Sequence, residues 1–389
     1  EQSAVTRSRK AMIMFLLIFL LVYGGFHLYM FLKAKAALGF GMKSGIFVLL
    51  FLVLMVFAPI LIRMLEKPGL EPIARVMAYI GYTWMGLLVL FFCISIVIDV
   101  LRLLIFLTGL VASKNFSSIT SVSLYHFLVP FLLSVSFVIY GFFEAADIRT
   151  ERIRIETSKI PQEIGRFKIV QISDIHLGII VGEGKLKKIL DIVKREDPDL
   201  LVSTGDLVDG EMCNLTGVVN LLREIKPPYG KFAVTGNHEF YAGLDKALAF
   251  TEDAGFTLLR QEATEVAGFL NVVGVDDGEA KRFGRTRAVS EKELLSGLPQ
   301  ENFTLFLKHR PNLGKGSLGL FDLQLSGHAH KGQIFPFGLV TGAIYPTDDG
   351  CLKLEDGSYL CVSRGAGTWG PPIRFLAPPD VMVIELVRK

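Results

Sequence analysis

The sequence predicts an N-terminal α-helical membrane domain of about four transmembrane helices, followed by an α/β domain. Two observations carry this prediction. Only 18 of the first 149 residues are Lys, Arg, Asp or Glu, whereas about a quarter of the later residues are charged. Four long apolar runs lie in the first part, and short β-rich runs alternate with helix-like segments in the second. We expect domains at residues 1–148 and 149–389, which excludes a single globular fold and a disordered chain.

The four apolar runs define the expected spans. They cover residues 11–32, 45–65, 76–98 and 122–143. Each is close to the roughly 20 helical residues that cross a bilayer core. The first run is longer than the core of a signal peptide, so we expect it to remain as an anchor. The third continues into apolar residues 103–112, which either prolong the same helix or lie at the membrane interface.

Basic residues flank the spans unevenly. Nine Lys or Arg lie before the first span, between the second and third, and after the fourth, against five on the other side. Cytoplasmic loops are enriched in Lys and Arg. We therefore expect an integral, multi-pass inner-membrane protein with its second domain in the cytoplasm. Within the membrane region, Asp99 and Arg102 are spaced to form an ion pair along one helix.

Two of the four cysteines, Cys351 and Cys361, flank a predicted hairpin that turns at Asp356-Gly357. A two-residue turn places Cys361 opposite Leu352 rather than opposite Cys351. We therefore expect unpaired thiols.

Five short apolar runs of the second domain end in polar residues. The runs cover residues 167–172, 199–203, 231–235, 304–308 and 322–326. The polar residues that follow them are Asp174, His176, Asp206, Asp209, Asn237, His238, His309, His328 and His330. In an open α/β sheet the carboxyl ends of the strands face one crevice, where ligands bind. All five histidines of this domain belong to the set, which favours a functional site over core packing.

This mixture of imidazole and carboxylate groups suits manganese, iron or zinc better than magnesium. The candidates are too many for one ion, so we predict two divalent ions that share a ligand. Manganese is our first expectation, with iron and zinc as alternatives. Two ions about 4 Å apart can hold a bridging hydroxide and clamp a phosphoryl group.

At these residues the sequence resembles the calcineurin-like metallophosphoesterase superfamily, over roughly residues 166–389. The matching blocks, in order, are Asp174-x-His176, Gly205-Asp206-x-x-Asp209, Gly236-Asn237-His238-Glu239, His309 and Gly327-His328-x-His330. The resemblance implies an α/β β-sandwich flanked by helices. The run from Ser326 to Ile334 is similar to the bacterial branch of membrane-associated phosphodiesterases. Gly210-Glu211 stands where phosphoprotein phosphatases carry Arg-Gly, which argues against that class.

The resemblance also implies a role for each position. The first metal would be bound by Asp174, His176, Asp206 and His330. Asp206 would bridge to a second metal, completed by Asn237, His309 and His328. His238 would stabilise the phosphoryl oxygens or protonate the leaving group, and Asp209 would orient it. A simple turn carboxylate is the alternative for Asp209.

Further residues are candidates for substrate contact. Arg282 and Arg285 lie in a basic, glycine-containing loop, where a solvated loop is the alternative. Arg310 follows His309 and could contact phosphate or pair with a local carboxylate. Two apolar loops, at residues 179–181 and 369–376, could accept an acyl chain or pack against protein.

These expectations combine into a membrane-anchored, dinuclear metal-dependent phosphoesterase, either a phosphodiesterase or a pyrophosphatase. Its expected partners are membrane lipids and a lipid-linked or membrane-delivered phosphate ester. The second domain is slightly acidic and lacks a basic stripe, so no nucleic acid is expected. Two alternatives stay open: a tethered hydrolase of soluble nucleotides or cyclic phosphodiesters, and a non-catalytic phosphate-binding receptor or scaffold.

Overall fold

The computed structural model divides the chain into two compact units. One comprises residues 1–65 and 72–141, and the other comprises residues 66–71 and 142–389. The structure describes all residues except 1, 115, 117–123, 211–215, 286–288 and 315. It describes no side chains for residues 1–13, 15 and 16.

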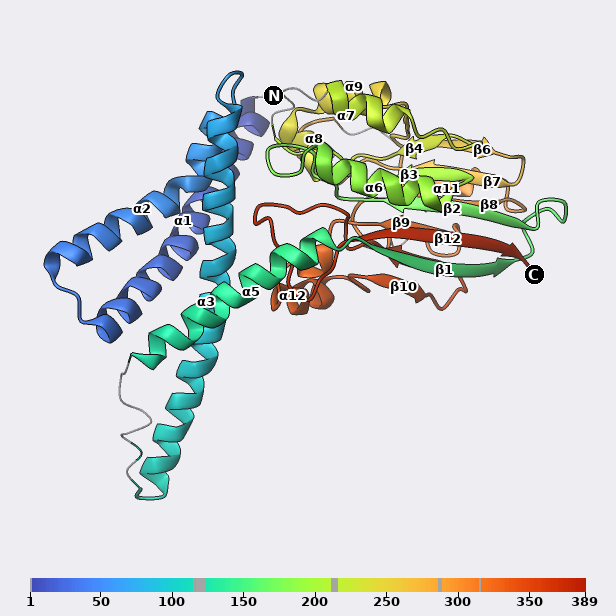
Figure 1. The fold of residues 1–389 in the computed structure, drawn as a ribbon. Helices are drawn as coiled ribbons and strands as arrows, with labels where there is room; N and C mark the ends of the chain where they lie inside the picture. Colours follow the sequence, from blue (N-terminus) through green and yellow to red (C-terminus); the bar gives the residue numbers. More distant parts are fainter. Residues whose placement is uncertain (1, 115, 117–123, 211–215, 286–288, 315) are drawn as a thin grey trace. The chain divides into compact units, whose positions relative to one another are not determined.

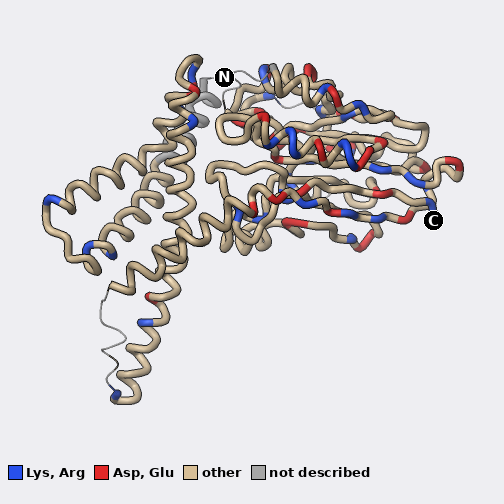
Figure 2. The backbone as a smooth tube through the Cα atoms, viewed as in Figure 1, with Lys and Arg blue, Asp and Glu red and all other residues tan. Residues whose placement is uncertain are grey.

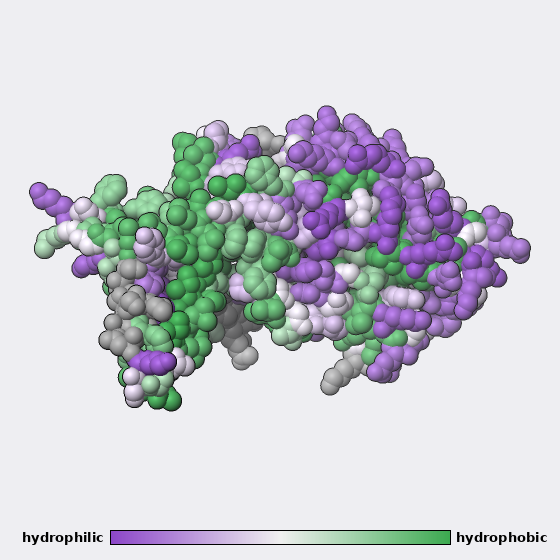
Figure 3. Space-filling view, turned by 60° about the horizontal axis from the view of Figure 1, so that its bottom comes forward, coloured by the Kyte–Doolittle hydropathy of each residue, from purple (hydrophilic) through white to green (hydrophobic). Residues whose placement is uncertain are grey.

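Four long helices lie in the described part of the N-terminal region (Figure 1). They are α1 (Gln2–Leu38), α2 (Met42–Leu65), α3 (Glu71–Val111) and α5 (Tyr125–Ala146). All four are long and apolar enough to cross a membrane, which confirms the prediction of four candidate spans. Apolar residues 103–111 continue α3 without a break, whereas residues 122 and 123 of the fourth predicted run lie outside the described residues. The helices carry a largely hydrophobic surface (Figure 3) and few charges (Figure 2).

One cluster of polar side chains joins α1 to α3. The Asp99 carboxylate pairs with Arg102 at 3.4 Å, as the spacing predicts. It also pairs with Lys33 of α1 at 2.9 Å and accepts a hydrogen bond from Tyr29 at 2.6 Å. Because a charged group in an apolar helix is costly unless it is paired, these contacts stabilise the association of the two helices.

The second unit is built on two six-stranded sheets. In spatial order, the first sheet contains β1 (Arg149–Thr157), β12 (Asp380–Arg388), β2 (Arg166–Ile172), β3 (Leu200–Ser203), β4 (Lys231–Ala233) and β5 (Thr257–Leu258). The second contains β10 (Gly350–Lys353), β11 (Tyr359–Val362), β9 (Leu323–Ser326), β8 (Phe303–Leu307), β7 (Leu270–Gly274) and β6 (Glu262–Val266). The helices are α6 (Glu183–Glu196), α7 (Thr216–Arg223), α8 (Asn237–Ala242), α9 (Leu244–Asp253), α10 (Glu279–Arg282), α11 (Glu291–Ser296), the short 3-10 helix η1 (His330–Gly332) and α12 (Phe337–Ile344).

The hydrophobic core fills the space between the two sheets. Ile169 of the first sheet packs in one cluster with Leu305 and Leu323 of the second. Its neighbour Val170 packs in another cluster with Leu186 of α6. Successive strand residues point to opposite faces, so neighbouring apolar residues of a central strand contribute to the clusters on its two sides. The predicted sandwich flanked by helices is confirmed.

The hairpin of β10 and β11 corrects one prediction. Cys351 lies opposite Cys361 and the two form a disulfide. The hairpin closes through a hydrogen bond from the Leu354 amide to the Ser358 carbonyl at 2.8 Å, so three residues make the loop. The prediction of unpaired thiols is wrong because it assumed a two-residue turn, and one extra residue shifts the register by one position.

Candidate dinuclear metal centre

The polar residues that follow five strands meet at one end of the sandwich. The three strands β2, β3 and β4 are parallel neighbours in the first sheet, and β8 and β9 are parallel neighbours in the second. The site therefore lies across the carboxyl ends of two packed sheets, not of the single open sheet that the sequence argument assumed. Nδ1 of His309, which follows β8, donates a hydrogen bond to the Thr204 carbonyl after β3, at 2.8 Å, and so joins the two sheets.

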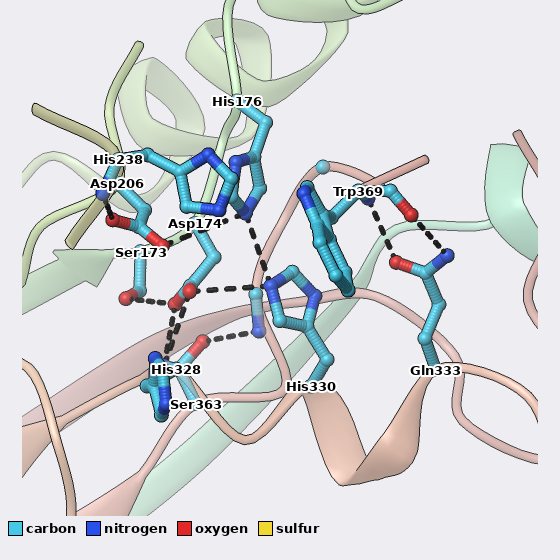
Figure 4. Close-up of polar contacts among 12 residues, drawn as sticks. Ser173, Asp174, His176, Asp206, His238, His328, His330, Gln333, Ser363 and Trp369 are labelled. Atoms are coloured by element: carbon cyan, nitrogen blue, oxygen red, sulfur yellow. Dashed lines mark hydrogen bonds and ion pairs between the residues drawn. The ribbon is translucent and has the colours of Figure 1, made fainter. Parts of the chain in front are cut away.

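A first group of buried side chains consists of Asp174, His176 and His330 (Figure 4). Nε2 of His330 lies 3.1 Å from Nε2 of His176 and 3.2 Å from Oδ1 of Asp174. Oδ2 of Asp206 lies 3.8 Å from Nε2 of His176. The three side chains of this group thus lie close enough together to hold one ion, and Asp206 lies beside His176.

A second group shares the Asp206 carboxylate. Its Oδ2 lies 3.2 Å from Nε2 of His309. That nitrogen is also 3.2 Å from Oδ1 of Asn237 and 3.2 Å from Nδ1 of His328. Oδ2 of Asp206 therefore lies near ligand-type nitrogens of both groups, His176 in the first and His309 in the second.

The spacing of these atoms fits two divalent ions. Nitrogen and oxygen ligands lie about 2.0–2.2 Å from a transition-metal ion, which puts neighbouring ligands about 3 Å apart. The two groups offer imidazole, carboxylate and amide donors at close to that separation. These buried His/Asp clusters are consistent with a dimetal site.

Five of the site residues hold a backbone conformation that side chains disfavour. The residues with φ between 49° and 67° are Asp174, His176, Asp206, His328 and His330. This left-handed region is uncommon for residues other than glycine, and such strain concentrates at functional sites. Hydrogen bonds hold two of these turns in place: the amide of Asp174 donates to the Gly205 carbonyl and that of His176 to the Asp206 carbonyl, each at 3.0 Å.

Glu239 fixes the backbone around Asp206, a role that the sequence alone did not assign. Its carboxylate accepts hydrogen bonds from the amides of Gly236 at 2.7 Å, Asp206 at 3.0 Å and Leu207 at 2.7 Å. Burial and the nearby charge of Asp206 raise the pKa of Glu239 to about 7. The fourth position of the Gly236-Asn237-His238-Glu239 block was the available signal for this residue.

His238 and Asp209 lie within hydrogen-bonding distance, as the family resemblance implies. Nδ1 of His238 lies 2.9 Å from Oδ1 of Asp209. Burial disfavours the charged imidazole, but the charge of Asp206 and the hydrogen bond to Asp209 outweigh it and raise the pKa of His238 to about 9. The charged form of His238 is therefore favoured at neutral pH.

The pKa values of three other site histidines are shifted in opposite directions. Burial lowers the pKa of His309, but the charge and hydrogen bond of Asp206 outweigh burial and raise this pKa to about 10. Burial and the positive charge of a neighbouring histidine lower the pKa of His176 and of His328 to about 3. Without metal, the site thus balances its carboxylates with protons on a few imidazoles. A bound cation would displace such a proton.

The candidate substrate-binding arginines are all engaged by carboxylates. Nε of Arg310 lies 2.7 Å from Oδ2 of Asp277, which is the local pairing left open above. Arg282 pairs with Glu279 at 3.5 Å. The third, Arg285, pairs with Asp245 at 3.4 Å. Their contact with substrate stays a prediction.

The sequence predicted no site role for Arg374, and it indicated Trp369 only as part of an apolar loop. Arg374 is fully buried, and one guanidinium nitrogen lies 3.1 Å from Nδ1 of His330 and 2.7 Å from the Gly367 carbonyl. The ring of Trp369 lies 5.8 Å from that of His238 (Figure 4). Both residues belong to the predicted apolar loop at residues 369–376, whose composition did not indicate which side chains face the site. The other loop packs inward: Val181 is 1% exposed and Ile180 lies against the core.

Comparison with known proteins gives consistent results. A family model described as calcineurin-like phosphoesterase matches residues 167–332. An uncharacterized metallophosphoesterase of Aquifex aeolicus is 42% identical over 251 residues, which cover 64% of this chain and 96% of that protein. An uncharacterized metallophosphoesterase of Campylobacter jejuni is 30% identical over 323 residues, covering 80% of this chain and 84% of that protein. A transmembrane protein with metallophosphoesterase domain from Danio rerio is 28% identical over 273 residues, covering 67% and 62% of the two chains.

Proposed function

Because this chain belongs to the calcineurin-like metallophosphoesterase family, we propose that it is a membrane-anchored, dinuclear metal-dependent phosphodiesterase or pyrophosphatase. The observation that carries the proposal is the sharing of the buried Asp206 carboxylate by two groups of metal-ligand side chains. The proposed substrate is a lipid-linked or membrane-delivered phosphate ester. Four candidate membrane helices on the same chain support that substrate class.

The ligand roles follow the two groups. We assign Asp174, His176, Asp206 and His330 to the first ion, and Asp206, Asn237, His309 and His328 to the second. Manganese fits this donor set, and iron or zinc fit it as alternatives. Two divalent ions would supply Lewis acidity and activate water for attack on phosphorus.

His238 and Asp209 are the proposed catalytic pair. The Asp209 carboxylate, 2.9 Å away, holds the imidazole of His238 in one orientation and favours its charged form. The other ring nitrogen can then hydrogen-bond to phosphoryl oxygen or donate a proton to the leaving group. The Glu239 carboxylate accepts hydrogen bonds from the amides of Gly236 and Asp206, and it thereby holds the loops around Asp206 and the catalytic pair in position.

We place the catalytic domain in the cytoplasm on the bias of Lys and Arg around the spans. One observation argues against this placement: the Cys351–Cys361 disulfide is more typical of an oxidising compartment than of the cytoplasm. A fluorescent protein fused after Lys389 tests the proposal, since it should fluoresce only if the C-terminus is cytoplasmic. A fusion that stays dark while C-terminal alkaline phosphatase is active reverses the assignment.

The enzymatic proposal is tested with the full-length protein in detergent, loaded with Mn²⁺ and assayed on bis(p-nitrophenyl) phosphate. Removing the shared ligand in Asp206→Ala should abolish turnover, and His238→Ala should lower it about 10²–10⁴-fold. Asp191→Asn, an exposed carboxylate on α6, is the control and should retain activity. Unchanged turnover in both site variants contradicts the proposal. Turnover of a detergent-dispersed lipid phosphodiester beside a cyclic nucleotide separates the two substrate classes.

A further inference from the structure

The helix α12 of the second unit is apolar and exposed. None of its eight residues is charged or buried. Leu339 and Ile344 are 68% and 65% exposed, and Phe337 and Val340 are also exposed. A helix that is apolar on all sides is normally covered by protein or lipid. We therefore expect an apolar partner to cover α12.

Leu376, which lies outside α12, is also apolar and exposed, and it is hydrogen-bonded to the end of α5. Its amide donates to Oε2 of Glu144 at 2.8 Å. Nζ of Lys185 donates to the carbonyl of Ala145 at 3.0 Å, which ties α6 to the same helix end. Residues 142–146 of α5 belong to the same compact unit as the sheets. Leu376 thus lies where a candidate membrane span ends.

Backbone hydrogen bonds join α12 to this point. The Phe335 amide donates to the Phe375 carbonyl and the Phe375 amide to the Gln333 carbonyl, each at 2.9 Å. The Gln333 side chain accepts from the Trp369 amide at 2.8 Å and donates to the Trp369 carbonyl at 2.9 Å (Figure 4). We call α12 together with Phe335, Trp369 and Leu376 the apolar rim.

The apolar rim borders the metal ligands at two places. Trp369, itself 56% exposed, lies 5.8 Å from His238 between ring centres. Tyr345, which directly follows α12, lies 6.1 Å from His328. Whatever covers the rim therefore lies next to the candidate active site.

We infer that the apolar rim inserts into the lipid bilayer at the level where α5 leaves it. Continuity with the end of α5 identifies the bilayer as the occupant, because the rim and that helix end are hydrogen-bonded parts of one compact unit. An apolar helix at an interface reaches about 5–10 Å into the boundary of headgroups and acyl chains. The metal ligands then face phosphate groups at headgroup depth. The inference concerns position alone, so it stands or falls independently of the proposed hydrolytic activity.

Tryptophan fluorescence tests this insertion directly, because the chain has only two tryptophans, Trp84 and Trp369. In the Trp84→Phe variant of the full-length protein, reconstituted in phosphatidylcholine vesicles, Trp369 is the sole tryptophan. Lipids brominated near the top of the acyl chain should quench most of its emission, whereas aqueous acrylamide should quench it weakly. Quenching by acrylamide but not by brominated lipid overturns the inference. Shielding from both quenchers also overturns it, since it places protein over the rim.

Trp84 donates a hydrogen bond to His27 at 3.0 Å, so a second pair of variants compares two positions that share any effect of removing it. Leu339→Trp and Leu318→Trp are each made in a background lacking both native tryptophans. Leu318 is 49% exposed and precedes β9, at the end of that strand opposite to the ligands. Brominated lipid should quench the tryptophan at position 339 and spare that at 318. Equal quenching at the two positions contradicts insertion by the rim.

Discussion

The pair of Asp209 and His238 shows how one carboxylate controls a neighbouring group. Asp209→Asn keeps the shape of the side chain and removes its charge. Loss of such an orienting partner typically costs about 10–100-fold in activity. We expect a drop of that size in kcat with metal content unchanged, measured by steady-state assay and elemental analysis.

The pH profile distinguishes this role from a purely structural one. The charge and hydrogen bond of Asp209 help to raise the pKa of His238 to about 9, so the charged imidazole is present at neutral pH and is lost as the pH rises through that value. Removing the Asp209 charge lowers this pKa. The alkaline limb of activity should therefore move to lower pH in Asp209→Asn. An unmoved limb with wild-type kcat would assign Asp209 to a simple turn.

Residues such as Asp174 and His328 could be identified from the sequence because each follows a short apolar strand, and the strand directs it to the sheet edge. Arg374 could not be identified in the same way. Its partners are backbone carbonyls and His330, and no local spacing relates those groups to an arginine. Only the folded chain brings them together.

The turn from β4 into α8 depends on a glycine for reasons of space. Gly236 has φ −96°, which any residue can adopt, but an added Cβ would lie 2.1 Å from Oδ1 of Asp206. Gly236→Ala must displace Asp206 or the turn, and we expect a loss of about 1–3 kcal/mol in unfolding free energy with weaker metal binding. Gly278→Ala is the matched control, since nothing lies within 4 Å of its Cβ. Thermal denaturation of both variants measures the difference, and equal stability contradicts the close-approach argument.

Elements were predicted well where local pattern determines them. β2, at Arg166–Ile172, falls close to the expected residues 167–172 because a short apolar run marks it. The β10–β11 register was wrong because it depends on a single loop residue, and α12 was not predicted because its short apolar sequence resembles core. Both cases depend on contacts that a local pattern does not record.

At the scale of the whole chain, the uneven distribution of charge predicts two parts, and the structure has two compact units. The two-sheet sandwich was predicted only from the resemblance to a known family, not from the distribution of charge. Its first sheet pairs β1 in parallel with β12, the first and last strands of the domain, and places β12 beside β2. Pairings over that sequence distance leave no periodic trace in the chain.

We propose that two ions sharing Asp206 make this chain a phosphoesterase. The most direct test is elemental analysis and phosphodiester turnover on one sample of full-length protein, before chelation, after chelation and after return of Mn²⁺. We predict two ions per wild-type chain, turnover that disappears with them and returns with Mn²⁺, and loss of both properties in Asp206→Ala. Full turnover in metal-free protein, or an Asp206→Ala variant that keeps two ions and full activity, would contradict the claim.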